Sequence, residues 1–597
     1  MKDFFKNILA TVFGFFLSIG IAIAFLIFSL IGTIVSSSSV PEIEDNSVLV
    51  LNLEGEITEK GSNDPFQALL GSNFASVGLN DILASIEKAK ENSKIKGIYI
   101  KSGLFASDYA TLQEIREKLA DFKKSGKWII AYSDMYMQGG YYIASVADQV
   151  YINPQGRMMW QGIGAQPTFY KDLLEKVGMK FTVVKVGTYK SATETFTEEK
   201  MSEASREQVT QYINGIWDNV LTGVSTSRKI SKETLNKYAD GIVMLETAEQ
   251  LKSKNLVDGL LYADEVKAAI RKKLNIDEDD DIKTVSVEGM KTVSVEKGKY
   301  SNEGKKIAVY YCEGDIIMDE TTGFAATSAS NIVANNVCRD IEELTKDDDI
   351  KAVVIRINSG GGDAYASEQL WRSISNLKKE KPVVVSMGGA AASGGYYMAC
   401  NASWIVAEPT TLTGSIGIFG MFPDMTNLMT QKLGIRYDEV KTNKNSTFSP
   451  AAIARPLNNE ELAYMQEYIN NGYYTFKKRV ADGRKMSLEE VERIAQGRVW
   501  LGQDAKKIKL VDELGTLDKA IAKAAQLAKT EKYNIKEYPN EKDFAEKLLE
   551  KTAGNGGELD AQLRVVLGAY YEPFVLVRTM KEQSPVQARV PFILNIK

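Results

Sequence analysis

Hydrophobic and polar positions alternate in blocks along most of this chain. Short β-branched runs, such as residues 351–358, 382–387 and 404–409, are typical of buried strands. Amphipathic stretches, such as residues 365–380, separate these runs and are typical of helices. Because strands that alternate with helices favour parallel pairing, the pattern predicts an α/β fold.

One segment near the N-terminus is almost wholly apolar. Residues 8–35 carry no charge, and as a helix they would span about 42 Å, more than the ~30 Å hydrocarbon core of a bilayer. Lysines precede the segment and acidic residues follow it. Since positive charge favours the cytoplasmic side, we predict a single retained transmembrane helix. Its N-terminus would lie in the cytoplasm, and everything after residue 45 would lie on the far side.

The remainder of the chain contains an internal repeat. The sequence IKGIYIK at residues 95–101 resembles IKAVVIR at residues 350–356, an offset of 255 residues. Two further pairs recur at nearly the same offset, QGGYYIA with SGGYYMA and LVDG with LVDE. Three matches at one nearly constant offset indicate two copies of one domain.

The repeat divides the chain into five parts. We assign residues 1–45 to the N-terminus and anchor, 46–280 to the first copy, 281–304 to a linker, 305–540 to the second copy and 541–597 to a C-terminal extension. The linker is acidic and then polar, so we expect at most a small hairpin turning at Gly289 and Met290. The extension has no partner in the repeat, and the sequence gives it no role.

Composition restricts the chemistry. The chain has 597 residues and no histidine, which excludes Ser-His-Asp and Cys-His catalysis and any histidine-ligated zinc site. Its three cysteines are odd in number and far apart, so they indicate neither a disulfide framework nor a metal site. The net charge of −5, with Lys and Arg spread throughout, does not suggest nucleic-acid binding. We therefore expect neither a metal nor another cofactor.

The two copies differ where a reaction would take place. Gly360, Gly361 and Gly362 of the second copy correspond to Phe-Ala-Ser at residues 105–107, and Ser393 corresponds to Gln138. Ser393 lies between a predicted strand end and a predicted helix start, where backbone N–H groups are unpaired. Small-residue runs alone favour an N-cap serine before a packed helix. The loss of both features in the first copy favours a nucleophile instead.

A serine nucleophile needs a base, and without histidine the natural candidate is a lysine whose pKa is lowered by burial. The segment VGTYKSATETF at residues 186–196 places Lys190 directly after a strand-like run. A solvated loop lysine is the alternative, and composition alone does not choose among the many lysines.

Four motifs together carry a resemblance. GTYKSA in the first half, and NSGGGDAYAS, ASGGYY and TLTGSIGIFG in the second half, resemble the signal peptide peptidase A family, peptidase family S49, in its long duplicated form. The resemblance runs from the anchor to about residue 540. It implies two tandem Clp/crotonase-like βα-superhelix domains after one N-terminal transmembrane helix.

The resemblance also implies a Ser–Lys dyad shared between the halves. Carried over, Ser393 is the nucleophile, Lys190 is the general base, and Ser415 orients the lysine amine. The oxyanion hole would be formed by Gly361, Gly362 and Gly394. Single-domain relatives take both dyad residues from one copy, which makes Lys444, at an offset of 254 from Lys190, an alternative base. The motif around Lys190 fits the long form of the family better than the motif around Lys444 does.

The family degrades remnant signal peptides after their release from secretory proteins. The resemblance therefore implies a membrane-anchored serine endopeptidase that acts on hydrophobic signal peptides. It further implies a homotetramer in the bacterial inner membrane, with the catalytic domains on the periplasmic side and no cofactor. The chain departs from the family where Gly360 replaces a proline and where the proline that often precedes the phenylalanine of KSATETF is missing, but neither change removes a functional atom.

Two other classes of function are alternatives to a peptidase. A crotonase-type acyl-CoA enzyme also uses a glycine turn as an oxyanion hole, but the predicted anchor and outward topology disfavour it. A non-enzymatic assembly protein, in which the second copy has also lost activity, is the other alternative.

Overall fold

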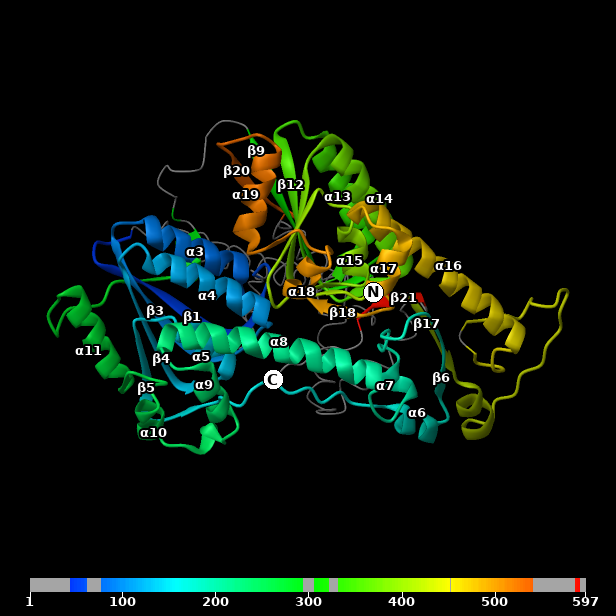
Figure 1. The fold of residues 1–597 in the computed structure, drawn as a ribbon, viewed down its shortest axis with the longest axis horizontal. Helices are drawn as coiled ribbons and strands as arrows, with labels where there is room; N and C mark the ends of the chain where they lie inside the picture. Colours follow the sequence, from blue (N-terminus) through cyan, green and yellow to red (C-terminus); the bar gives the residue numbers. More distant parts are fainter. Residues whose placement is uncertain are drawn as a thin grey trace, which may run out of the picture.

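The computed structural model describes residues 43–61, 77–291, 293, 305–320, 331–450, 452–540 and 586–590. These residues form three β-sheets flanked by helices (Figure 1). The predicted transmembrane segment, residues 8–35, lies outside the described residues. Within the described ranges, no helix combines the length and the apolar character needed to cross a membrane.

The first half builds a seven-stranded sheet in the order β2-β1-β3-β4-β5-β7, with β8 beside β1. All of its pairs are parallel. Because side chains alternate along a strand, Leu49 and Leu51 face one core and Val48 faces the other. Helices α3 and α4 cover the first face, and α11 covers the second. The strands are β1 Ser47–Thr58, β2 Val77–Gly78, β3 Ile95–Ala106, β4 Trp128–Tyr136, β5 Gln149–Met158, β7 Gly259–Leu260 and β8 Thr284–Ser286. The helices are α3 Leu79–Glu91, α4 Tyr109–Lys123, α5 Gln138–Ala144, α6 Lys171–Val177, α7 Glu194–Thr197, α8 Glu203–Arg228, α9 Lys232–Ala239, α10 Ala248–Ser253, α11 Ala263–Leu274 and α12 Val287–Lys291.

The second half builds an eight-stranded sheet in the order β18-β16-β14-β12-β9-β20, with β15 beside β14 and β19 beside β15. Val353 and Ile355 face the core under α13 and α14, whereas Val354 faces the core under α19. The strands are β9 Lys306–Glu313, β12 Ile350–Ser359, β14 Val383–Ala392, β15 Trp404–Ala407, β16 Leu412–Gly414, β18 Val499–Leu501, β19 Glu513–Leu514 and β20 Asn534–Tyr538. The helices are α13 Ala334–Lys346, α14 Ala364–Glu380, α15 Gly394–Ala399, α16 Asn459–Arg484, α17 Leu488–Ile494, α18 Gly502–Lys507 and α19 Leu517–Leu527.

The two halves correspond in their sheets and in several of their helices. Helices α3 and α13 both have 13 residues, and α8 and α16 both have 26. In both halves one face of the sheet is covered by two successive helices and the other by a later helix, α11 or α19. The α/β class predicted from the sequence is confirmed, and the internal repeat has a direct structural counterpart.

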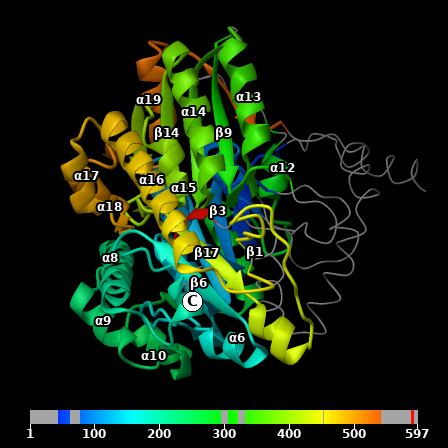
Figure 2. The same ribbon diagram turned by 90° about the vertical axis from the view of Figure 1, so that its right-hand side faces the viewer.

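A third sheet joins the two halves. Its six strands run in the order β11-β10-β13-β21-β17-β6. Strand β6 comes from the first half and pairs antiparallel with β17 of the second half over its full length (Figure 2). The strands are β6 Lys180–Lys185, β10 Asp315–Ile317, β11 Asn331–Val333, β13 Gly361–Asp363, β17 Phe419–Asp424 and β21 Val586–Arg589. Because β6 pairs with β17, the segment that follows β6 in the sequence runs into the second half.

The predicted linker contains regular structure. Strand β8 extends the first sheet beside β1, and α12 follows it, so the expected hairpin at Gly289 and Met290 is wrong. The physical reason is burial, because Val285 and Met290 both belong to the core of the first half. The C-terminal extension also contributes a strand, β21, to the third sheet. The first segment thus extends the sheet of the first half, and the second adds a strand to the sheet that joins the two halves.

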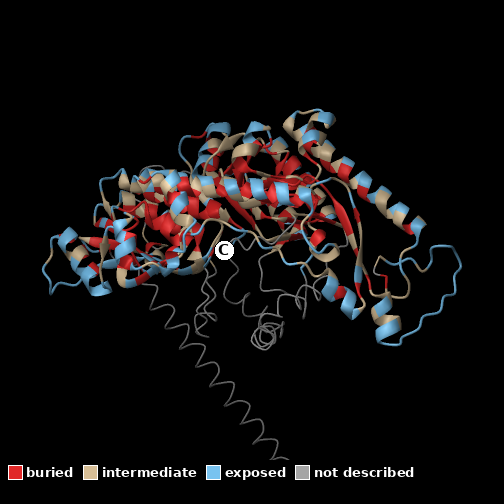
Figure 3. Cartoon of the chain, turned by 60° about the horizontal axis from the view of Figure 1, so that its bottom comes forward, coloured by how far each residue is buried: buried red, intermediate tan, exposed pale blue. Residues whose placement is uncertain are grey.

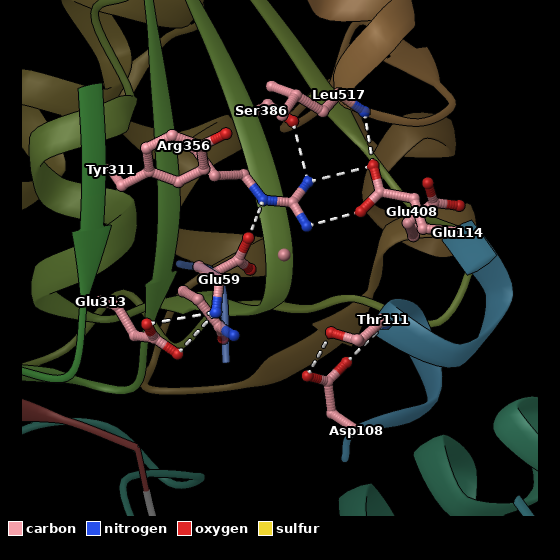
Figure 4. A network of polar contacts seen from close by, with 12 residues as sticks. Glu59, Asp108, Thr111, Glu114, Tyr311, Glu313, Arg356, Ser386, Glu408 and Leu517 are labelled. Carbon is pink, nitrogen blue, oxygen red and sulfur yellow. Dashed lines mark hydrogen bonds and ion pairs between the residues drawn. The ribbon is translucent and has the colours of Figure 1, made fainter. Parts of the chain in front are cut away.

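A buried polar network lies at the junction of the halves, where buried residues continue from one half into the other (Figure 3). Arg356 of β12 donates to Glu59 Oε2 at 2.9 Å and to Glu114 Oε2 at 2.7 Å (Figure 4). The Leu517 N–H also donates to Glu114, at 2.6 Å. These contacts tie residues of the first half to the second sheet and to α19, and so fix the relative position of the halves.

The network holds more carboxyl groups than cations. Burial raises the pKa of Glu59 and raises that of Glu408 well above its ordinary value. The Glu408 oxygens have no hydrogen-bond partner among the described residues. Burial and the nearby Glu59 raise the pKa of Glu313 to about 7. Protonation of these carboxyl groups at the junction is therefore linked to the free energy of unfolding.

Candidate active site

Ser393 occupies a strained turn between β14 and α15. Its backbone has φ 54° and ψ −113°, a conformation that disfavours a residue with a side chain. Two hydrogen bonds hold the turn: the Ser393 N–H donates to Gly414 O, and the Tyr397 N–H donates to Ser393 O, each at 2.8 Å. The Ser393 side chain makes no capping hydrogen bond to α15, so its hydroxyl is not used as a helix cap.

Strand β6 delivers Lys190 to this turn from the other half of the chain. After the strand, Val186 N–H donates to Ile418 O, and Tyr189 N–H donates to Gln496 O. The loop is thereby hydrogen-bonded to the second half at two points just before the lysine. The Lys190 side chain can then point inward, and it is fully buried.

The amine of Lys190 lies among three oxygens. Its Nζ is 2.7 Å from Ser393 Oγ, 3.0 Å from Ser415 Oγ and 3.2 Å from Ser415 O. All three residues are fully buried. Burial lowers the pKa of Lys190 well below its ordinary value. An amine that is neutral in this position can accept a proton from the adjacent hydroxyl.

Ser415 is held by its own backbone in a second strained turn. Its φ is 49°, and its N–H donates to Arg498 O at 2.7 Å. The turn follows β16, which pairs with β14 beside Ser393. Both serines therefore reach the amine from neighbouring strand ends of one sheet.

The glycine turn predicted from the sequence lies next to Ser393. Gly361 has φ +101°, and a side-chain carbon placed on it would stand 2.7 Å from the Gly394 nitrogen. The Gly361 N–H donates to Ser359 Oγ at 3.1 Å, and Gly362 pairs with Ile316 of β10. Gly361 therefore lies directly beside Gly394, the residue that follows Ser393.

Sequence comparison assigns the chain to a family. The profile of Peptidase family S49 matches residues 121–277 and 375–531, once in each half and together over more than half of the chain. This chain belongs to peptidase family S49. The Clp protease profile also matches, over residues 311–405.

Curated relatives of this S49 chain match along most of their length. Protease 4 of Salmonella typhi is 35% identical over 526 residues, which cover 85% of this chain and 82% of that protein. Protease 4 of Haemophilus influenzae is 33% identical, with coverage of 80% and 78%. The chloroplastic serine protease SPPA of Arabidopsis thaliana is 32% identical, with coverage of 81% and 70%.

The first S49 repeat carries other side chains at the corresponding positions. Gln138, which matches Ser393, donates to Tyr109 OH and Gly162 O and accepts from two backbone N–H groups. Trp160, which lies 255 residues before Ser415, is fully buried in the core. An amide and an indole thus fill the space that the second repeat uses for two hydroxyl groups.

Lys444, the alternative base in the second S49 repeat, lies on the surface. Its side chain is 71% exposed and forms an ion pair with Glu460. The pKa of Lys444 is raised by its hydrogen bond with that carboxylate. A protonated, solvated lysine has none of the properties that a general base needs.

Sequence reasoning missed one residue that shapes the S49 site. Gly497, with φ +78°, lies against Lys190 so closely that a side-chain carbon on it would stand 2.7 Å from Lys190 Cβ. The comparison of repeats gives no signal for this residue, because the first copy also has a glycine, Gly241, in its matching Ala-X-Gly segment. The role of Gly497 follows only from the structure, in which the loop that carries Lys190 passes directly against this glycine.

Proposed function

We propose that this chain is a serine endopeptidase in which neutral Lys190 is the general base for Ser393. The observation that carries the proposal is the distance of 2.7 Å between Lys190 Nζ and Ser393 Oγ, in a site from which water is excluded. The second-half serine and the first-half lysine would then form one dyad, supported by Ser415.

The first step of the reaction is acylation. The Ser393 hydroxyl transfers its proton to the Lys190 amine as Oγ attacks the carbonyl carbon of the peptide. Two neutral oxygens, Ser415 Oγ and Ser415 O, hold the amine and accept hydrogen bonds from it. The resulting ammonium then donates a proton to the leaving amine, and the C–N bond breaks.

Backbone groups around the glycine turn complete the scheme. The backbone at Gly361 and Gly394 is the proposed place for the oxyanion of the tetrahedral intermediate, with the N–H of Gly394, the residue after the nucleophile, as a donor. Gly362 contributes the rigid strand that fixes this space. In the second step, water gives a proton to Lys190 as its oxygen attacks the ester carbon, the bond from that carbon to Ser393 Oγ breaks, and Lys190 returns the proton to Oγ.

The substrates that we propose are hydrophobic signal peptides left in the membrane after secretory proteins have been processed. The apolar run at residues 8–35 supports a single-pass anchor in a bacterial inner membrane, and the charges that flank it support catalytic domains on the periplasmic side. A homotetramer is part of the same proposal. Together these features would keep the site close to peptides in the bilayer.

The test compares the intact protein with Ser393→Ala, Lys190→Ala and Lys444→Ala in mild detergent. A hydrophobic peptide with a fluorophore and a quencher reports cleavage, and a fluorophosphonate probe reports reactivity of the serine. We expect loss of cleavage in the first two variants and full activity in Lys444→Ala. Normal cleavage in Ser393→Ala or Lys190→Ala would overturn the proposal.

The same preparation separates the other two classes of function. If Ser393 forms no adduct and no peptide is cut, a non-enzymatic assembly role is favoured. Turnover of an acyl-CoA thioester without peptide cleavage would favour crotonase-type chemistry. The folded state of each variant is checked by its thermal unfolding midpoint.

A further inference from the structure

Gln208 of helix α8 lies buried between the lysine loop and the second half. The residue is 1% exposed. Its Nε2 donates to Tyr189 O at 3.1 Å and to Ser191 Oγ at 3.0 Å. Its Oε1 accepts from the Val499 N–H at 3.2 Å. One amide therefore bonds to the residues on either side of Lys190 and to β18, a strand of the second half.

The two donor contacts of Gln208 hold the turn that carries Lys190. The Ser191 N–H donates to Tyr189 O at 2.9 Å, so Lys190 is the central residue of a three-residue turn. Gln208 donates to both ends of this turn. Because Ser191 is fully buried, bulk water cannot take the place of the amide at its hydroxyl. The backbone at Lys190, and with it the direction of the lysine side chain, is thus held by Gln208.

The acceptor contact of the same amide reaches the strand that supports both serine turns. Val499 pairs with Gly414 of β16, and the Gly414 carbonyl accepts from the Ser393 N–H at 2.8 Å. The carbonyl of Arg498, which precedes Val499, accepts from the Ser415 N–H at 2.7 Å. One side chain is therefore bonded to the lysine turn on one side and to the support of both serines on the other.

Helix α8, which carries Gln208, is itself fixed against β18. Gly215 lies seven residues after Gln208 and therefore on the same face of the helix. A side-chain carbon placed on Gly215 would stand 2.2 Å from Leu501 Cδ1, so the helix packs directly on the strand. Val499 and Leu501 belong to the hydrophobic core of the first half, although they come from the second. The position of the Gln208 amide is therefore set by the second half as well as by the first.

The second repeat has a different side chain at the corresponding place. Helices α8 and α16 have equal lengths and begin after the N-caps Ser202 and Asn458, so Gln208 corresponds to Tyr464. Tyr464 is 55% exposed. The copy that supplies the buried lysine thus has the amide, whereas the copy with the exposed Lys444 has an exposed phenol.

We propose that Gln208 is a positioning residue for the peptidase reaction, which holds the Lys190 amine against Ser393 Oγ by bonding the lysine turn to β18. This inference rests on the proposed peptidase function and adds a residue to it. Gln208 does not contact the reacting atoms, so it acts only through the turn. Without the amide, the turn moves and admits water, which favours the ammonium form of Lys190. The pKa of Lys190 then rises toward its ordinary value.

The variant Gln208→Leu removes the three hydrogen bonds and keeps a side chain of similar size. We expect kcat for the peptide with fluorophore and quencher to fall by about tenfold, because the amine is displaced. The acid limb of the pH profile of kcat/KM reports the pKa of the free base, and we expect it to move up by about one pH unit. A loss of folded protein alone would lower the rate at every pH and would leave this limb in place.

The matched control is Gln113→Leu. Gln113 of α4 is also a buried amide, but it donates to Glu117 and accepts from Thr410 of the second half, so it is bonded across the junction away from the lysine turn. This control should keep the pH profile of the unmodified chain. Equal movement of the acid limb in Gln113→Leu and Gln208→Leu would overturn the positioning role.

A second variant, Ser191→Ala, removes one of the three hydrogen bonds and leaves Gln208 in place. It should move the acid limb in the same direction by a smaller amount, and the double variant Gln208→Leu/Ser191→Ala should show no further movement. Additive movements would mean that the two residues act independently and would overturn the proposal. If Gln208→Leu does not fold, Ser191→Ala alone decides.

The unmodified chain separates this proposal from the peptidase function. If the unmodified chain cuts the peptide and the acid limb stays in place in Gln208→Leu and Ser191→Ala, only the positioning role fails. If the unmodified chain cuts no peptide, the peptidase function fails and the positioning role fails with it.

Discussion

Gly497 lies against the backbone of Lys190, and an alanine methyl group at this position would stand 2.7 Å from Lys190 Cβ and from its backbone nitrogen. The two residues belong to different repeats, so the contact sets how deeply the lysine loop enters the second half. The position of the Lys190 amine thus depends on the absence of a side chain at residue 497.

We therefore expect Gly497→Ala to lower kcat by about tenfold to a hundredfold, because displacing a catalytic group by about 1 Å has effects of this size. Peptide cleavage under saturating substrate measures the effect. Gly126→Ala is the matched control, since Gly126 also has a positive φ, +81°, but has open space around it. Equal kcat values for the two variants would contradict this role of Gly497.

Replacing Lys190 with methionine should abolish cleavage and yet stabilise the protein near neutral pH. The pKa of Lys190 is lowered by burial, so the unfolded state binds more protons than the folded state at pH values between the two pKa values. Stability of the unmodified chain should therefore rise with pH in that window, and the advantage of Lys190→Met should shrink as pH approaches about 10. Thermal unfolding midpoints from pH 7 to pH 10 measure this difference, and a constant advantage would contradict it.

Ser393 combines its reactive group with an unfavourable backbone conformation. Glycine adopts positive φ freely, so Ser393→Gly should be more stable than Ser393→Ala by about 1 kcal/mol, although both lack the nucleophile. Chemical denaturation of the two variants gives the comparison. If Ser393→Ala is as stable as Ser393→Gly, the turn is not strained in the way that its dihedral angles indicate.

The pH dependence of stability should also change at the junction of the halves. Glu313 has a pKa raised to about 7, and a carboxyl group with a raised pKa stabilises the fold at low pH. That contribution is complete below about pH 4 and is lost as pH rises through about 7. Glu313→Gln should therefore reduce the loss of stability between pH 5 and pH 8. Glu233→Gln, on the exposed surface of α9, serves as the control and should leave the pH profile unchanged.

Much of the fold could be predicted from the repeat. The similarity of residues 95–101 to 350–356 corresponds to β3 and β12, which lie at equivalent places in the first and second sheets. The strand at residues 404–409 and the helix at 365–380 were predicted within a few residues of β15 and α14. The sequence pattern was sufficient here because the β-branched runs form strands that are buried on both faces, whereas the amphipathic stretch forms a helix that buries one face.

The site could be predicted only in part from the residues themselves. Ser393 was indicated by comparison of the two copies, but Lys190 was selected among many lysines through a family resemblance. The reason is that β6 pairs with β17 across the junction, and no local pattern encodes this pairing. Strand β21 was missed for a related reason, because its four residues are too few to show a hydrophobic period, and its backbone pairs only with strands that are distant in the sequence.

The strand pair β6–β17 also makes the proposed dyad a property of both copies together. The positions that correspond to Ser393 and Lys190 in the opposite copies hold Gln138, which is hydrogen-bonded, and Lys444, which is exposed. Removal of either copy would take away one strand of this pair and one member of the proposed dyad. Under the proposed mechanism, neither copy can act as a peptidase alone.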